Sequence, residues 1–279
     1  MRAAAVQLNS QADKDRNLDV AERLVRDAAA DGADLVVLPE KWNVLGTAEV
    51  LIEGGEPLDG PTITACRGWA RELGITLVAG SIVERVEGQE KLSNTSALIG
   101  PDGEIEATYR KIHMFDVDVG GVEYRESDTQ EPGGEIVVAD AGGVPLGMTV
   151  CYDVRFPELY RILAVRGARV VTVPAAFTLH TGKDHWELLM RARAVENQVF
   201  VVAAGQYGEA PPHYHSYGRS MIVDPWGVVL ATAPDEECFV AADLDFALQD
   251  SIREKLPSLA NRVPGAYQWP DLDPVGPSR

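Results

Sequence analysis

The most informative segment of the chain is Thr149-Val150-Cys151-Tyr152-Asp153-Val154-Arg155-Phe156-Pro157-Glu158. It leads from an apolar strand, expected over residues 144–150, into a polar segment that begins a helix at Pro157. Cys151 therefore lies at a strand-to-helix elbow, where backbone N–H groups of the coming helix can face an oxyanion. A lone cysteine after an apolar strand is more often inert packing, so the elbow alone leaves both roles open.

Two further strands end in the groups that a nucleophilic thiol needs. The apolar run 35–38 leads to Glu40, and the hairpin strand 104–109 leads to Lys111. Lys111 can favour the thiolate, and Glu40 can take the thiol proton. Lys111 and the Tyr152 N–H can stabilise a tetrahedral oxyanion, while protonated Glu40 can release ammonia from an amide. Together the three residues predict amide hydrolysis without metal or histidine.

Each of these charged residues also has a simpler interpretation. Glu40 is followed by Lys41, which is typical of a solvated loop after a strand. Lys111 can equally belong to a basic surface pair with Arg110. Only the combination of Glu40, Lys111 and Cys151 favours a catalytic site.

Strands and helices alternate along the chain, which indicates an α/β class. Continuous apolar strands imply sheets that are covered on both faces. Residues 39–61 are expected to form a loop, and Asp184 is expected to cap a helix. The expected helices are 15–30, 62–73, 157–166, 184–197 and 245–255, and the expected strands are 2–7, 35–38, 75–79, 93–99, 104–109, 135–139, 144–150, 170–173, 199–203, 220–223, 228–231 and 238–244.

The composition excludes several classes of partner. The net charge is −18, from 25 basic and 43 acidic residues, which argues against binding to nucleic acid or to an anionic membrane. No apolar run approaches the roughly 20 residues of a membrane helix, and residues 1–8 do not resemble a signal peptide. We therefore expect a cytoplasmic protein.

Metal and nucleotide chemistry lack a sequence signal. The three cysteines form no CxxC pair, so neither a disulfide framework nor a zinc site is expected. The run His213-Tyr214-His215 has no acidic or cysteine partner nearby, and no phosphate-binding glycine motif is present. No histidine carries a local signature of a Cys–His protease, and we expect no metal and no cofactor.

Residues 1–256 are expected to form a single domain, because no linker or low-complexity stretch interrupts them. The tail 257–279 holds five prolines and little periodicity, so it cannot build a core of its own. Tyr267 and Trp269 favour its packing at a subunit interface.

Nearly the whole chain resembles the nitrilase superfamily of carbon–nitrogen hydrolases, and most of all its Nit branch of omega-amidase-like and deaminated-glutathione-amidase-like proteins. The segments that carry the resemblance are 38–40 (LPE), 109–116 (YRKIHMFD), 151–158 (CYDVRFPE) and 185–197 (HWELLMRARAVEN).

The resemblance implies a four-layer α-β-β-α sandwich, a catalytic triad of Glu40, Lys111 and Cys151, and a homodimer or higher homo-oligomer. It further implies a second active-site glutamate. Glu126 fits this position better than Glu123, because a serine follows it as in the Nit branch.

Four residues are candidates for substrate binding. Tyr152 follows the expected nucleophile. The nitrilases of the superfamily tend to have Trp-Glu directly after the cysteine, so by this resemblance Tyr152-Asp153 favours amides over nitriles as substrates. Arg155 can hold a substrate carboxylate through two hydrogen bonds, or it can pair with Glu158. Phe177 and Thr178 are expected near the pocket, although core packing is the simpler role for Phe177.

These observations predict a cofactor-free thiol amidase that acts on a small carboxylated amide through an acyl-enzyme, with the omega-amide of a 2-oxo acid as the first choice of substrate. A nitrilase or an N-carbamoyl amino acid hydrolase of the same fold is the nearest alternative. A non-catalytic binding relative is a further alternative, which the three intact residues disfavour.

Overall fold

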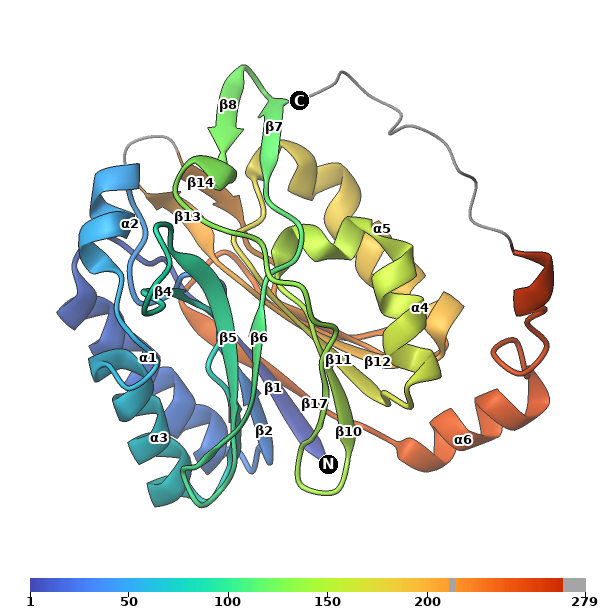
Figure 1. Cartoon of the computed structure of the whole chain (residues 1–279). Coiled ribbons are helices and arrows are strands. Elements are labelled where there is room, and N and C mark those ends of the chain that lie inside the picture. The colour runs from blue at the N-terminus through green and yellow to red at the C-terminus, as the bar shows by residue number, and fades with distance from the viewer. Residues whose placement is uncertain (211–213, 268–279) are drawn as a thin grey trace.

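The computed structural model describes residues 1–210 and 214–267, and in this part of the chain two β-sheets pack face to face between two layers of helices (Figure 1). The first sheet has the order β17-β1-β2-β3-β5-β4, with β6 pairing β5, and the second has the order β16-β15-β12-β11-β10-β9. The strands of the first sheet are β1 (Arg2–Gln7), β2 (Leu35–Val37), β3 (Thr76–Val78), β4 (Ile82–Glu84), β5 (Ser93–Ile99), β6 (Ile105–Arg110) and β17 (Cys238–Asp243). Those of the second are β9 (Val138–Asp140), β10 (Pro145–Met148), β11 (Val170–Ala175), β12 (Phe200–Gly205), β15 (Met221–Val223) and β16 (Val229–Thr232).

Helices cover the outer face of each sheet. α1 (Lys14–Ala30) and α3 (Pro61–Leu73) lie on the first sheet, and α4 (Pro157–Val165) and α5 (Leu179–Asn197) lie on the second (Figure 1). The four layers confirm the expected α/β class and the α-β-β-α arrangement. None of the helices in the described residues is long and apolar enough to cross a bilayer.

The central strands are apolar on both faces because both faces are buried. Along β1, Ala3 and Ala5 belong to the core between the sheets, while Ala4 and Val6 belong to the core under α1 and α3. This alternation follows from the two-residue period of a strand, and it confirms that the sheets are covered on both sides.

The prediction that Asp184 caps a helix is wrong. α5 begins five residues earlier, at Leu179, and the Thr178 side chain accepts a hydrogen bond from the Thr181 N–H. Asp184 is an exposed residue inside this helix. Gly182 made the earlier start of the helix hard to recognise in the sequence. In the structure this glycine allows close packing, because a Cβ there would lie 2.3 Å from the Cβ of Tyr217.

Short elements at one end of the sandwich were not predicted. The expected loop 39–61 contains α2 (Ala48–Gly54). The strand expected over 135–139 is shorter and begins three residues later, as β9 (Val138–Asp140). The hairpins β7 (Asp116–Val119)–β8 (Val122–Arg125) and β13 (Tyr207–Ala210)–β14 (Tyr214–Tyr217) were also not expected, and each of their strands is only four residues long. Both hairpins lie at the same end of the sandwich as α2 (Figure 1), and residues of α2 and β8 line the cavity described below.

The chain closes with α6 (Phe246–Lys255) and a short turn, η3 (Pro264–Ala266). Tyr267 is 67% exposed, and Trp269 lies outside the described residues. The single domain over residues 1–256 and the packing of the tail on a partner stay predictions.

Candidate active site

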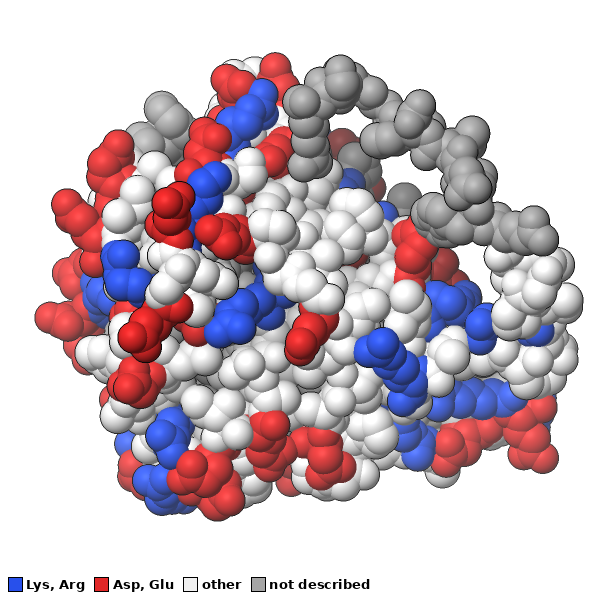
Figure 2. All heavy atoms as spheres, in the orientation of Figure 1, with Lys and Arg blue, Asp and Glu red and all other residues white. Residues whose placement is uncertain are grey.

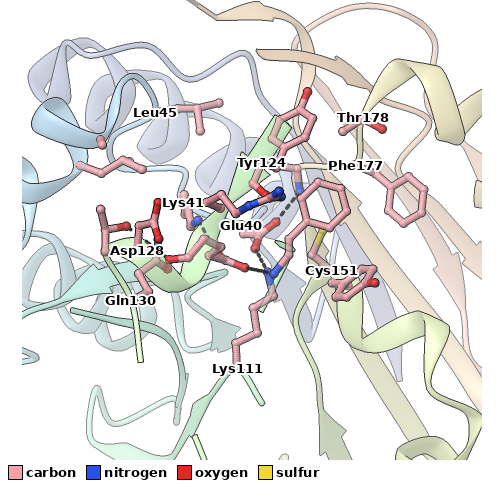
Figure 3. Close-up of a pocket in the computed structure, with 18 of the residues that line it drawn as sticks. Glu40, Lys41, Leu45, Lys111, Tyr124, Asp128, Gln130, Cys151, Phe177 and Thr178 are labelled. Carbon is pink, nitrogen blue, oxygen red and sulfur yellow. Dashed lines mark hydrogen bonds and ion pairs between the residues drawn. The ribbon is translucent and has the colours of Figure 1, made fainter. Parts of the chain in front are cut away.

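Glu40, Lys111 and Cys151 line one cavity of about 240 Å³. Glu40 follows β2, Lys111 follows β6 directly, and Cys151 opens a 3₁₀ turn, η2 (Cys151–Arg155), after β10. All three are buried, with 3%, 2% and 7% of their surfaces exposed. The strand ends of both sheets thus bring together residues that are far apart in the sequence (Figure 3).

Lys111 joins two carboxylates. Its Nζ lies 3.0 Å from Oε1 of Glu40 and 2.7 Å from Oε2 of Glu126. The Asn94 amide donates to the same two side chains, at 2.8 Å to Glu40 and 3.2 Å to Glu126. Glu126 opens the turn η1 (Glu126–Asp128), and its Oε2 also accepts the Phe115 N–H at 2.8 Å.

The structure separates the two candidates for the second glutamate. Glu126 is buried between the lysines, whereas Glu123 is on the rim of the cavity and forms an ion pair with the exposed Arg125. Glu126 is thus the one that contacts Lys111.

Lys41 is a fourth charged member of the cluster, and sequence reasoning missed it. Its Nζ lies 2.7 Å from Oε1 of Glu126. With the Gln130 amide oriented so that its nitrogen faces Glu126, Gln130 donates to Glu126 Oε1 at 3.2 Å and accepts from Lys41 Nζ at 3.1 Å. In the sequence, Lys41 favoured a solvated loop for Glu40, but both residues are buried. Its position beside Glu40 was the one available signal.

The charges of the cluster set the ionisation of the thiol and its base. Burial raises the pKa of the Glu40 carboxyl, but the charges of Lys111 and Lys41 outweigh burial and hold this pKa below its usual value. Burial lowers the pKa of Lys111, but Glu126 and Glu40 raise it well above its usual value. Burial and the Glu40 charge raise the pKa of Cys151 well above the ordinary range. The resting site therefore holds a thiol, a carboxylate and an ammonium.

Glu40 is oriented for proton exchange with the sulfur. Its Oε2 accepts the Ala176 N–H at 2.8 Å, and its carboxylate is a hydrogen-bond partner of the Cys151 thiol. Because Lys111, Asn94 and Ala176 hold the carboxylate, it is fixed before any substrate binds.

A buried aspartate holds the elbow that carries Cys151. Cys151 has a φ of +49°, which is strained for a residue with a side chain. Asp153 is fully buried and accepts the Val150 N–H at 2.8 Å and the Tyr109 hydroxyl at 2.6 Å. It also meets His113 Nδ1 at 2.7 Å. The Val150 contact is local to the elbow, whereas Tyr109 and His113 are about 40 residues away, and the sequence held no signal for their contacts.

The four predicted binding residues all line the cavity, and Arg155 is the charged one among them. Its guanidinium lies over the rings of Phe177, at 5.0 Å, and Tyr152, at 5.9 Å. One of its nitrogens, Nη1, lies 3.4 Å from Nδ1 of His185. Within the described residues no carboxylate forms an ion pair with Arg155, so the expected alternative with Glu158 is not observed.

Phe177 and Thr178 combine a place in the cavity wall with a structural role. Phe177 packs its ring against Trp186 at 5.2 Å and is 6% exposed. Thr178 caps α5. The simpler role of core packing for Phe177 therefore coexists with its place at the cavity.

The remaining wall is apolar on the side of α2, where Leu45, Ala48 and Leu51 line the cavity. A small substrate could thus place a carbon chain along α2 and a negative group near Arg155. In residues 1–210 and 214–267, no group of three or more His, Cys, Asp or Glu side chains is arranged to hold a metal ion.

The family model described as carbon-nitrogen hydrolase matches residues 2–254. The human omega-amidase NIT2 is 42% identical over 95% of this chain and 96% of its own length. The deaminated glutathione amidase of Synechocystis sp. (strain PCC 6803 / GT-S) is 41% identical over 94% of this chain and 97% of its own length.

Solved structures agree with these matches. Saccharomyces cerevisiae Nit3, described as a member of branch 10 of the nitrilase superfamily, has a TM-score of 0.84 at 33% identity, over 92% of this chain and 94% of its own. A mutant of the amidase from Nesterenkonia sp. AN1, with acrylamide added at the active-site cysteine, has a TM-score of 0.76 at 29% identity, over 92% of this chain and 98% of its own.

Proposed function

This chain belongs to the carbon-nitrogen hydrolase family and is an amide-hydrolysing enzyme, and we propose that it cleaves a small carboxylated amide through an acyl-enzyme on Cys151. The observation that carries the proposal is the buried contact network of Glu40, Lys111 and Glu126 beside the Cys151 thiol, in a cavity that also contains Arg155.

In the first step, the Cys151 sulfur attacks the amide carbonyl while the thiol proton moves to Glu40. A thiol with a raised pKa is a poor nucleophile by itself, so a fixed carboxylate that accepts its proton as the C–S bond forms is needed. The Lys111 ammonium and the Tyr152 N–H would stabilise the oxyanion.

In the second step, protonated Glu40 gives its proton to the amide nitrogen, the C–N bond breaks, and ammonia leaves. Water then attacks the thioester carbonyl while Glu40 accepts one of its protons. The C–S bond breaks, Glu40 returns this proton to the sulfur, and the carboxylic acid product leaves the free Cys151 thiol. Glu126 would hold Lys111 in place throughout, since its Oε2 lies 2.7 Å from the lysine nitrogen.

The cavity supports a substrate with a carboxylate. Arg155 lines the cavity without an ion-pair partner among the described residues, and its planar guanidinium matches a carboxylate. We propose the omega-amide of a 2-oxo acid as the first candidate, in keeping with the omega-amidase among the relatives.

An ammonia-release assay over omega-amides, deaminated glutathione, aliphatic amides, nitriles and N-carbamoyl acids tests the proposal. We expect release from carboxylated amides, and a quenched reaction should give a mass increment of the acyl group on Cys151 that is absent in Cys151→Ala. Release mainly from nitriles or carbamoyl acids would favour the alternative hydrolases. No release from any class would favour a binding protein, and full activity of Cys151→Ala would refute the mechanism.

A further inference from the structure

Lys41 is a buried lysine in the cavity wall to which the mechanism above gives no task. Its ammonium lies 2.7 Å from Oε1 of Glu126, while the Lys111 ammonium lies 2.7 Å from Oε2 of the same carboxylate. Two lysines thus hold the two oxygens of one carboxylate, and both lysines are labelled in Figure 3.

The charges of the cluster balance only with Lys41. Glu40 and Glu126 carry two negative charges, and Lys111 and Lys41 carry two positive ones, with the side chains of all four at most 10% exposed. Without Lys41, two buried carboxylates would share one ammonium, and a buried charge without a partner is costly. Glu40 and Glu126 would then share the uncompensated negative charge. Their carboxylates are already close together, since both accept hydrogen bonds from the Asn94 amide nitrogen.

The backbone at Lys41 supports a specific use of its side chain. Lys41 has a φ of +50°, in the left-handed region that glycine adopts without strain, and its N–H donates to Ser81 Oγ at 3.1 Å. A non-glycine residue there costs about 1 kcal/mol or more. The side chain must offset this cost, and its contact with Glu126 is a means to do so.

We propose that Lys41 is a positioning residue: it fixes Glu126 and balances the charge of the buried cluster, so that Lys111 stays available to the reacting carbonyl and Glu40 stays ionised to accept the thiol proton. This inference rests on the proposed function and deepens it. The charged and titratable groups that act on Glu40 are Lys111, Lys41, Glu126 and Cys151, and Asp128 and Arg155 line the same cavity.

The direct test is the pH dependence of Cys151 alkylation by iodoacetamide, which needs no substrate. In the wild type the charges of Lys111 and Lys41 lower the pKa of Glu40, so the reaction should stay fast well into the acid range. In Lys41→Met the lost positive charge disfavours ionised Glu40, so its pKa rises. The acid limb of the profile, where the alkylation rate falls as Glu40 becomes protonated, should then move to higher pH by about one unit or more.

Two controls separate charge from fold. Lys41→Arg keeps the charge and should keep the acid limb near that of the wild type. Lys255→Met removes an exposed lysine at the end of α6 and should leave the limb unchanged. If Lys41→Met does not fold, Lys41→Gln offers Glu126 an uncharged donor and should show the same displacement.

An acid limb that stays in place in an uncharged variant, with only a loss of thermal stability, would make Lys41 a structural residue and overturn the proposal. Because alkylation reports on Cys151 itself, this result is independent of whether any proposed amide is hydrolysed. If Cys151 reacts no faster than a model thiol in the wild type, the proposed function fails instead.

Discussion

At the scale of single residues, the site combines fixed charges with one cation that has no ionic partner among the described residues. Glu40, Glu126, Lys41 and Lys111 neutralise one another, whereas Arg155 contacts aromatic rings. A guanidinium over aromatic faces keeps donors at its edge for an anion. This contrast makes Arg155 the residue for a test of substrate charge.

Arg155→Lys should raise KM for a carboxylated amide by roughly tenfold or more and change it little for a neutral amide of the same length, because lysine cannot offer the paired donors of arginine. Steady-state kinetics on the matched pair of amides measures this. Arg125→Lys is the control, since Arg125 lines the same cavity but pairs with Glu123. An equal increase in KM for both amides would contradict the role of Arg155 in binding the substrate carboxylate.

Asp153→Asn should destabilise the protein by roughly 1–3 kcal/mol and slow alkylation of Cys151, because an amide NH₂ would face donors that now bond a carboxylate. Those donors are the Val150 N–H and the Tyr109 hydroxyl. Urea unfolding and thiol alkylation provide the measurements. Asp140→Asn, at an exposed turn, should change neither. A stable variant with a slow thiol would mean that Asp153 acts on reactivity alone.

At the scale of elements, the bend after β2 depends on a close backbone approach. Gly80 has a φ of +56°, and a Cβ there would lie 2.0 Å from the carbonyl oxygen of Pro39, next to Glu40. The glycine therefore allows the loop after β3 to pack against the segment that carries the Glu40 carboxylate.

Gly80→Ala should cost more than the roughly 1–2 kcal/mol of left-handed strain alone and should lower activity, since relief of the clash moves Glu40. Gly74→Ala is the matched control, because Gly74 has a φ of +66° with open space at its Cβ position. Urea unfolding compares the two. If Gly80→Ala lowers the free energy of unfolding no more than Gly74→Ala does, the loop after β3 can shift to accommodate the Cβ, and the close approach is not required.

At the scale of the whole molecule, charge and apolar surface are unevenly arranged. Acidic and basic residues surround a broad uncharged area in the face of Figure 2, within a chain of net charge −18. Exposed apolar side chains occur on α4 and α5, at Ile162, Val165, Leu188 and Val195. Exposed apolar side chains of this kind are typical of a subunit interface. The homo-oligomer stays a prediction, and we expect its interface to include α4 and α5.

Sedimentation velocity tests this prediction. The wild type should sediment as a dimer or larger assembly, and Leu188→Lys should shift it toward the monomer, because a charge would be buried in the contact. Ile52→Lys replaces an exposed apolar residue on α2 and should leave the assembly intact. A monomeric wild type at micromolar concentration would make the prediction wrong.

Most strands and helices and the residues at the strand ends were predictable from the sequence, because periodicity, prolines, glycines and the elbow at Cys151 are local properties of the chain. It did not determine the short polar hairpins β7–β8 and β13–β14 or the start of α5 at Leu179, whose conformations depend on neighbours. The burial of Lys41 against Glu126 and the hydrogen bond between Tyr109 and Asp153 could not be predicted in this way. The energy of these contacts depends on burial and distance between segments far apart in sequence, and neither quantity exists until the two sheets pack together.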